Sequence, residues 1–143
     1  MDTRGPDDGR VLVTAKTVRV LLVDDQESFR SAARLVIGMV DCFELVGEAE
    51  SAEDGLELAS SLAPDLVLMD INLPGIDGLE ATRRLVGNLS GAKVIVLSTY
   101  EAVEYEARSL EAGAVAFMSK SDFGPDVLRE IWDQVADCQV ADC

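Results

Sequence analysis

The sequence contains no histidine, which excludes Ser-His-Asp and Cys-His catalysis and most zinc chemistry. Basic residues are also scarce, because 12 lysines and arginines stand against 27 acidic residues and give a net charge of −15. Such a segment is not expected to bind nucleic acid directly or to adhere to an anionic membrane surface. Its charge suits a cation or a basic partner instead.

The sequence also lacks a long apolar stretch and a cysteine framework. No run is long enough to cross a bilayer, and the N-terminal residues have no apolar core like that of a signal peptide. Cys42, Cys138 and Cys143 are odd in number and follow no recognisable zinc spacing. We therefore expect free thiols and a cytoplasmic protein without membrane association.

A regular alternation of short apolar runs and amphipathic stretches is present, in a chain whose 143 residues fit one domain. Residues 1–16 are expected to be a flexible segment, 17–137 the folded domain and 138–143 a tail. The alternation predicts five strand–helix pairs. The strands are expected at 18–23, 43–47, 66–69, 94–97 and 114–118, and the helices at about 29–40, 52–61, 79–88, 102–111 and from 125 onward.

The apolar runs are continuous rather than alternating, which indicates strands that are buried on both faces of a sheet. Parallel strands with helices on both sides meet that requirement. Right-handed crossovers then favour a flavodoxin-like (βα)5 three-layer sandwich with a parallel sheet of order 2-1-3-4-5. In such a fold, sites form at the carboxyl ends of the strands.

Polar side chains follow four of the five predicted strands at that edge. Taken singly, each has an ordinary explanation: an acidic residue can cap a helix or begin a turn, a serine can cap a helix, and a lysine can be a solvated surface charge. Their functional interpretation rests on their convergence, because the fold predicts the edge independently of the residues. The residues are Asp24 and Asp25 after the first strand, Asp70 after the third, Ser98 and Thr99 at the end of the fourth, and Lys120 after the fifth.

Three carboxylates at one edge would repel one another unless a cation lies between them. Mg²⁺ prefers oxygen ligands and often completes its shell with phosphate oxygens. Carboxylates also form aspartyl-phosphate intermediates, so Asp70 could act as a nucleophile. Ser98 could donate a hydrogen bond to a phosphoryl oxygen, and Lys120 could pair with another.

These residues resemble the response regulator receiver family, a CheY-like superfamily. The matching segments are RVLLVDDQESFR, PDLVLMDINLPGIDGLEA, VIVLSTY and LEAGAVAFMSK, and the resemblance extends from about Val18 to Asp137. The LSTY and LEAG segments are most similar to the NarL/LuxR-type subgroup. The resemblance implies a phosphoprotein of two-component signal transduction, with a sensor histidine kinase as its partner and with the control of transcription, through a fused domain or a partner, as its output.

The resemblance also implies roles for individual residues of the phosphorylation site. Asp70 corresponds to the phosphoacceptor, and Asp24 and Asp25 to the acidic pair that holds Mg²⁺. Asn72 corresponds to the position whose backbone carbonyl binds the metal, and Lys120 to the lysine that pairs with the phosphoryl group.

Further roles concern the response to phosphorylation. Ser98 corresponds to the switch hydroxyl and Phe117 to the aromatic residue that moves with it. Thr99 is bulkier than the alanine or glycine often found after that hydroxyl, and Tyr100 flanks the expected path of the hydrolytic water, so both are expected to modulate the site. Phosphorylation would reshape a surface for a partner or a homodimer.

Three alternatives remain open from the sequence. One is a receiver-like interaction module that signals without phosphate. Another is a haloacid-dehalogenase-type phosphatase, which usually has a second aspartate where this chain has Asn72. The third is an FMN-binding flavodoxin, although no Ser/Thr/Gly-rich phosphate loop follows the first strand. On the receiver interpretation the chain is not an enzyme, although it would catalyse its own phosphorylation and dephosphorylation.

Overall fold

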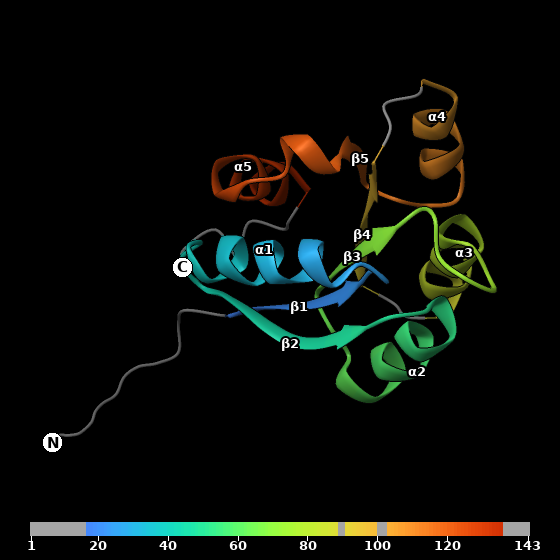
Figure 1. Cartoon of the computed structure of the whole chain (residues 1–143), viewed down its shortest axis with the longest axis horizontal. Helices are drawn as coiled ribbons and strands as arrows, with labels where there is room; N and C mark the ends of the chain where they lie inside the picture. Colours follow the sequence, from blue (N-terminus) through green and yellow to red (C-terminus); the bar gives the residue numbers. More distant parts are fainter. Residues whose placement is uncertain (1–16, 89–90, 100–102, 136–143) are drawn as a thin grey trace, which may run out of the picture.

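The computed structural model describes residues 17–88, 91–99 and 103–135. In this part of the chain five strands alternate with five α-helices, and a short 3-10 helix precedes the last of them (Figure 1). The strands are β1 (Val18–Val23), β2 (Phe43–Ala49), β3 (Leu66–Asp70), β4 (Lys93–Ser98) and β5 (Ala116–Ser119). The helices are α1 (Glu27–Gly38), α2 (Ala52–Leu62), α3 (Gly78–Asn88), α4 (Val103–Glu111), η1 (Lys120–Asp122) and α5 (Pro125–Val135).

The strands form one parallel sheet in the order β2-β1-β3-β4-β5. Helices α1 and α5 cover one face of this sheet, and α2, α3 and α4 cover the other (Figure 1). The predicted flavodoxin-like three-layer fold and its strand order are therefore confirmed. None of the helices in the described ranges has the length and apolar character needed to span a membrane.

Strand β1 shows why the continuous apolar runs predicted this architecture. Leu21 and Val23 belong to the core cluster beneath α2 and α3, whereas Val20 and Leu22 belong to the cluster beneath α1 and α5. All four side chains are fully buried. A strand that is covered on both faces needs apolar side chains at successive positions, and this is the pattern that the sequence presents.

Two strand boundaries differ from the predicted ones. Strand β2 extends to Ala49, two residues further than expected, because its pairing with β1 continues after a register shift between Val20 and Leu21. Strand β5 begins at Ala116 rather than at residue 114. The Ala114 amide donates to the Ser109 carbonyl instead, so this residue belongs to the turn that closes the C-terminal end of α4.

The prediction of free thiols is wrong for Cys42, which is disulfide-bonded. Cys42 lies between α1 and β2 and has a positive φ of 69°. Sequence spacing could not show this bond, because a disulfide depends on distance in space rather than along the chain. Cys138 and Cys143 lie outside the described residues.

Candidate acidic phosphorylation site

An acidic cluster lies where β1 and β3 end. Asp24 directly follows β1, Asp70 is the last residue of β3, and these strands are paired neighbours in the sheet. Asp24, Asp25 and Asp70 each offer a carboxylate oxygen, and these atoms lie within 4.8 Å of one another. Asp24 and Asp70 are buried and Asp25 is exposed, so the cluster is open to solvent through Asp25. The structure thus brings together the three carboxylates that the sequence singled out.

Lys120 brings a positive charge to this cluster from the end of β5. Its ammonium nitrogen lies 2.7 Å from Asp24 Oδ2 and 3.4 Å from Asp70 Oδ2. It also donates a hydrogen bond of 3.0 Å to Gln26 Oε1 and lies 4.8 Å from the centre of the Phe29 ring. A lysine held on several sides in this way is a fixed charge beside Asp70 rather than a solvated surface group.

Burial dominates the electrostatics of Asp70. Desolvation, and to a lesser extent the nearby Asp24 charge, raise the pKa of Asp70 from 3.8 to about 6. The Asn72 amide, which donates to Asp70 Oδ1 at 3.1 Å, and the Lys120 ammonium group oppose this increase. The Asp70 carboxyl is therefore half-ionised at about pH 6 rather than near pH 3.8, and an added cation would favour its charged form.

The carboxylate oxygens at this edge suit a hard cation. Asp24 Oδ1 accepts from the Gln26 amide at 2.8 Å. Asp24 Oδ2 is buried and accepts no hydrogen bond from the described residues. The ion pair with Lys120 offsets its negative charge but does not meet the geometry of a hydrogen bond. Carboxylate oxygens with unused lone pairs are the ligands that Mg²⁺ takes in proteins. Asp24, Asp25 and Asp70 could therefore hold a metal ion.

The remaining predicted residues within the described ranges differ in burial. Ser98 is the buried last residue of β4, and its predecessor Leu97 pairs with Asp70 in the sheet register. Asn72 and Thr99 are exposed. Phe117 lies on β5 opposite Val96, where it is partly buried against the core cluster on the α2–α4 side. Tyr100 lies outside the described residues.

A surface groove of about 440 Å³ lies beside the cluster. Asp25 and Asn72 belong to its wall, together with Pro74, Tyr105 and Arg108. Of the three clustered carboxylates, Asp25 is the one that lines this groove.

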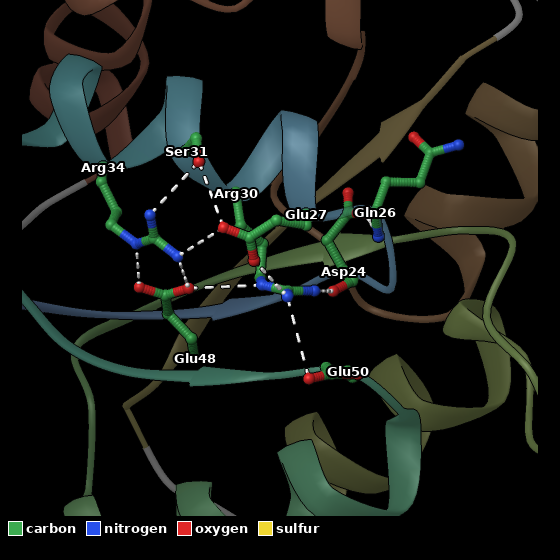
Figure 2. A network of polar contacts seen from close by, with 8 residues as sticks. All are labelled: Asp24, Gln26, Glu27, Arg30, Ser31, Arg34, Glu48 and Glu50. Carbon is green, nitrogen blue, oxygen red and sulfur yellow. Dashed lines mark hydrogen bonds and ion pairs between the residues drawn. The ribbon is translucent and has the colours of Figure 1, made fainter.

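Sequence reasoning missed three residues that contact the predicted ones: Gln26, Phe29 and Arg30. Gln26 and Phe29 carry no signal of their own, because their contacts with Lys120 join positions 120 and 26 or 29 across the fold. Arg30 did carry one. It precedes the buried Ala33 and Ile37 at helical spacing, which places a charged residue on the buried face of α1 (Figure 2).

Comparison with known proteins places this chain in a family. The chain matches the response regulator receiver domain over residues 20–133. It is 41% identical over 103 residues to the response regulator GacA of Pseudomonas viridiflava, which covers 72% of this chain and 48% of GacA. The response regulator UvrY of Escherichia coli strain K12 is 36% identical over 114 residues, which covers 80% of this chain and 52% of UvrY. The chain thus spans about half the length of these curated relatives.

A solved structure is also similar to this chain and is a receiver domain. The signal receiver domain of the response regulator NarL from Mycobacterium tuberculosis superposes with a TM-score of 0.75 at 28% identity, covering 88% of this chain and 98% of that domain. The predicted likeness to the NarL/LuxR-type subgroup is confirmed. The matches favour the receiver interpretation over a phosphatase or a flavodoxin, and the chain belongs to the response regulator receiver domain family.

Proposed function

We propose that this chain accepts a phosphoryl group on Asp70 from the phosphohistidine of a sensor histidine kinase. The observation that carries the proposal is the meeting of three carboxylates within 4.8 Å with the Lys120 ammonium group, which lies 3.4 Å from Asp70 Oδ2. This arrangement presents an oxygen nucleophile beside a fixed positive charge and a cation-binding cluster. Phosphoryl transfer depends on that combination of positioning and charge stabilisation.

The transfer is a displacement at phosphorus. A carboxylate oxygen of Asp70 forms the new bond to phosphorus, while the bond between phosphorus and the imidazole nitrogen breaks and its electron pair returns to the kinase histidine. Lys120 offsets the negative charge on the phosphoryl oxygens, and Ser98 donates a hydrogen bond to one of them. Mg²⁺ held by Asp24, Asp25, Asp70 and the Asn72 backbone carbonyl would supply the remaining positive charge.

Phosphorylation is proposed to shift the balance between two packings of the domain. Ser98 is buried at the end of β4 and Phe117 lies on the adjacent strand β5, so a movement of the serine toward the phosphoryl group changes the space beside the aromatic ring. The face formed by α4, β5 and α5 would then present a different surface to a partner or a second copy. Thr99 and Tyr100 are proposed to modulate the lifetime of the phosphorylated state.

The output is proposed to be the control of transcription. The chain spans about half of relatives named as response regulators, and one similar protein, DegU of Brevibacillus brevis, is named a transcriptional regulatory protein. A fused domain or a bound partner would contact DNA, since this segment has a net charge of −15. The cytoplasmic location stays a prediction, and a disulfide at Cys42 would be transient or redox-dependent there.

Intact-protein mass spectrometry after incubation with acetyl phosphate and Mg²⁺ tests the phosphoacceptor. The unmodified chain is expected to gain the mass of one phosphoryl group, and the gain should disappear without Mg²⁺ and in Asp70→Asn. Asp77→Asn is the matched control, because this exposed aspartate lies outside the acidic cluster. Absence of labelling in the unmodified chain, or equal labelling of Asp70→Asn, would refute the proposal.

A further inference from the structure

Arg30 contacts the backbone of the acidic pair at Asp24. Its side chain is 9% exposed, and its Nη1 donates to the backbone carbonyl of Asp24 at 2.6 Å. Figure 2 shows this guanidinium group between α1 and β2, directed at the Asp24 backbone rather than at its carboxylate. Arg30 is therefore close to the acidic pair without being a ligand candidate itself.

Three acidic residues hold the same guanidinium group in place. Nη2 donates to Glu27 at 2.6 Å and lies 3.8 Å from Glu50, while Nε lies 3.3 Å from Glu48 (Figure 2). These partners come from the first turn of α1 and from the end of β2 and its following turn. A planar group with donors in fixed directions can make these contacts together, whereas a lysine ammonium group presents one point charge.

The contact with the Asp24 carbonyl restrains the orientation of the next residue, because this carbonyl belongs to the peptide plane that joins Asp24 to Asp25. The Asp24 amide already donates to the Ala49 carbonyl at 3.0 Å, so β2 fixes the peptide on the N-terminal side of Asp24. Fixing its carbonyl orients the next peptide, and with it the direction in which the Asp25 side chain leaves the backbone. Asp25 is exposed, so burial does not orient its carboxylate.

We propose that Arg30 is a positioning residue for cation binding, which aligns the peptide between Asp24 and Asp25 so that both carboxylates meet Asp70. This inference rests on the proposed function, since it concerns the same magnesium site. Removing a group that orients a metal ligand without touching the metal typically lowers metal affinity by about 10–100-fold.

Electrostatics alone predicts the opposite sign. Removing a positive charge from the neighbourhood of three carboxylates should strengthen the binding of a cation. Weaker Mg²⁺ binding after loss of Arg30 would therefore reflect lost geometry, and the sign of the effect separates the two explanations.

The experiment is an Mg²⁺ titration of the full chain at constant ionic strength, followed by the amide NMR signals of residues 24–26 and 70–72. Arg30→Gln is expected to raise the Mg²⁺ Kd about tenfold. Arg30→Lys keeps the positive charge but loses the planar set of guanidinium donors, so a smaller increase in the Mg²⁺ Kd is expected. The matched control is Arg34→Gln, because Arg34 contacts Glu27 and Glu48 in the same network, whereas the Asp24 carbonyl accepts from Arg30. The Mg²⁺ Kd of Arg34→Gln should stay within about twofold of that of the unmodified chain or fall.

An unchanged or lower Kd in Arg30→Gln would overturn the inference, even if the variant were less stable to urea. Should Arg30→Gln fail to fold, Arg30→Lys decides: a Kd equal to that of the unmodified chain overturns the inference, and a higher Kd supports it. Absence of saturable Mg²⁺ binding in the unmodified chain would overturn both the inference and the proposed function. Normal binding there, with no effect at Arg30, would overturn the inference alone.

Discussion

Asp70 combines two properties that conflict in a stability argument. Its side chain is buried, yet the proposed chemistry needs its charged form. Between its ordinary pKa of 3.8 and the folded value of about 6, the folded chain binds more protons at this group than the unfolded chain. Stability therefore falls as pH rises through this interval, and the full penalty is present above about pH 6.

Replacing Asp70 with asparagine should remove this penalty. The pKa difference between 3.8 and about 6 corresponds to at most about 3 kcal/mol. We expect Asp70→Asn to raise the free energy of unfolding at pH 7.5 without Mg²⁺ by about 1–3 kcal/mol, and to give little change near pH 4. Urea unfolding across this pH range measures it, and a gain that is equally large at pH 4 would contradict the desolvation argument.

Lys120 is expected to have the opposite effect on stability. It is the ammonium partner of two buried carboxylates, and leaving a buried charge without its partner typically costs about 3–5 kcal/mol. Lys120→Met should therefore destabilise the protein by several kcal/mol without Mg²⁺, and added Mg²⁺ should restore part of the loss. Lys93→Met is the control, because Lys93 is the first residue of β4 and lies at the end of the strand away from the acidic cluster. It should change the free energy of unfolding by about 0.5 kcal/mol or less. A loss that Mg²⁺ leaves unchanged would argue against a shared cation site.

At the scale of the elements, the site depends on how closely α3 approaches the end of β3. The Gly78 amide donates to the Ile71 carbonyl at 3.1 Å, and a Cβ atom at Gly78 would lie 2.1 Å from the Asp70 carbonyl oxygen. No side chain fits at that distance. Glycine at the start of this helix therefore lets the backbone of α3 pass directly beside the proposed phosphoacceptor.

Gly78→Ala should displace α3 from the site. We expect a loss of about 1–3 kcal/mol in unfolding free energy, together with reduced phosphorylation by acetyl phosphate because Asp70 moves. Gly87→Ala provides the control within the same helix, where a Cβ atom would meet nothing within 4 Å. That variant should be more stable by about 0.5–1 kcal/mol and label normally. Equal behaviour of the two variants in urea unfolding would exclude the close-approach argument.

For the whole molecule, the net charge of −15 implies self-repulsion that any salt should reduce. The acidic cluster adds a specific effect on top of this general one, because a cation that binds only the folded state stabilises it by mass action. General screening and site binding can be distinguished when ionic strength is held constant.

At matched ionic strength, MgCl₂ should stabilise the protein more than NaCl, by about 1 kcal/mol or more once Mg²⁺ exceeds its Kd several-fold. An increase of this size raises the Tm by roughly 2–4 °C. Asp25→Asn should abolish the Mg²⁺-specific part and keep the NaCl response, since Asp25 is an exposed member of the cluster. Thermal melts monitored by circular dichroism measure both, and an Mg²⁺-specific gain retained in Asp25→Asn would contradict its assignment as a ligand.

The sequence by itself determined the architecture and the edge at which to look. Apolar runs such as 20–23 predicted strands covered on both faces, and that architecture predicts a site at the carboxyl ends of the strands. Asp24, Asp70 and Lys120 could be found in this way because each lies at a strand end, where position along the chain fixes position in the fold. Their proposed roles followed from the types of residue brought to that edge.

Only the tertiary structure decided the contacts that join distant segments. Gln26 meets Lys120, Arg30 reaches the Asp24 carbonyl as well as Glu48, and Cys42 is disulfide-bonded. The increased pKa of Asp70 likewise depends on burial by its surroundings. Periodicity reports which face of an element is apolar, whereas these features depend on distances between side chains of different elements, and packing sets those distances only when the chain has folded.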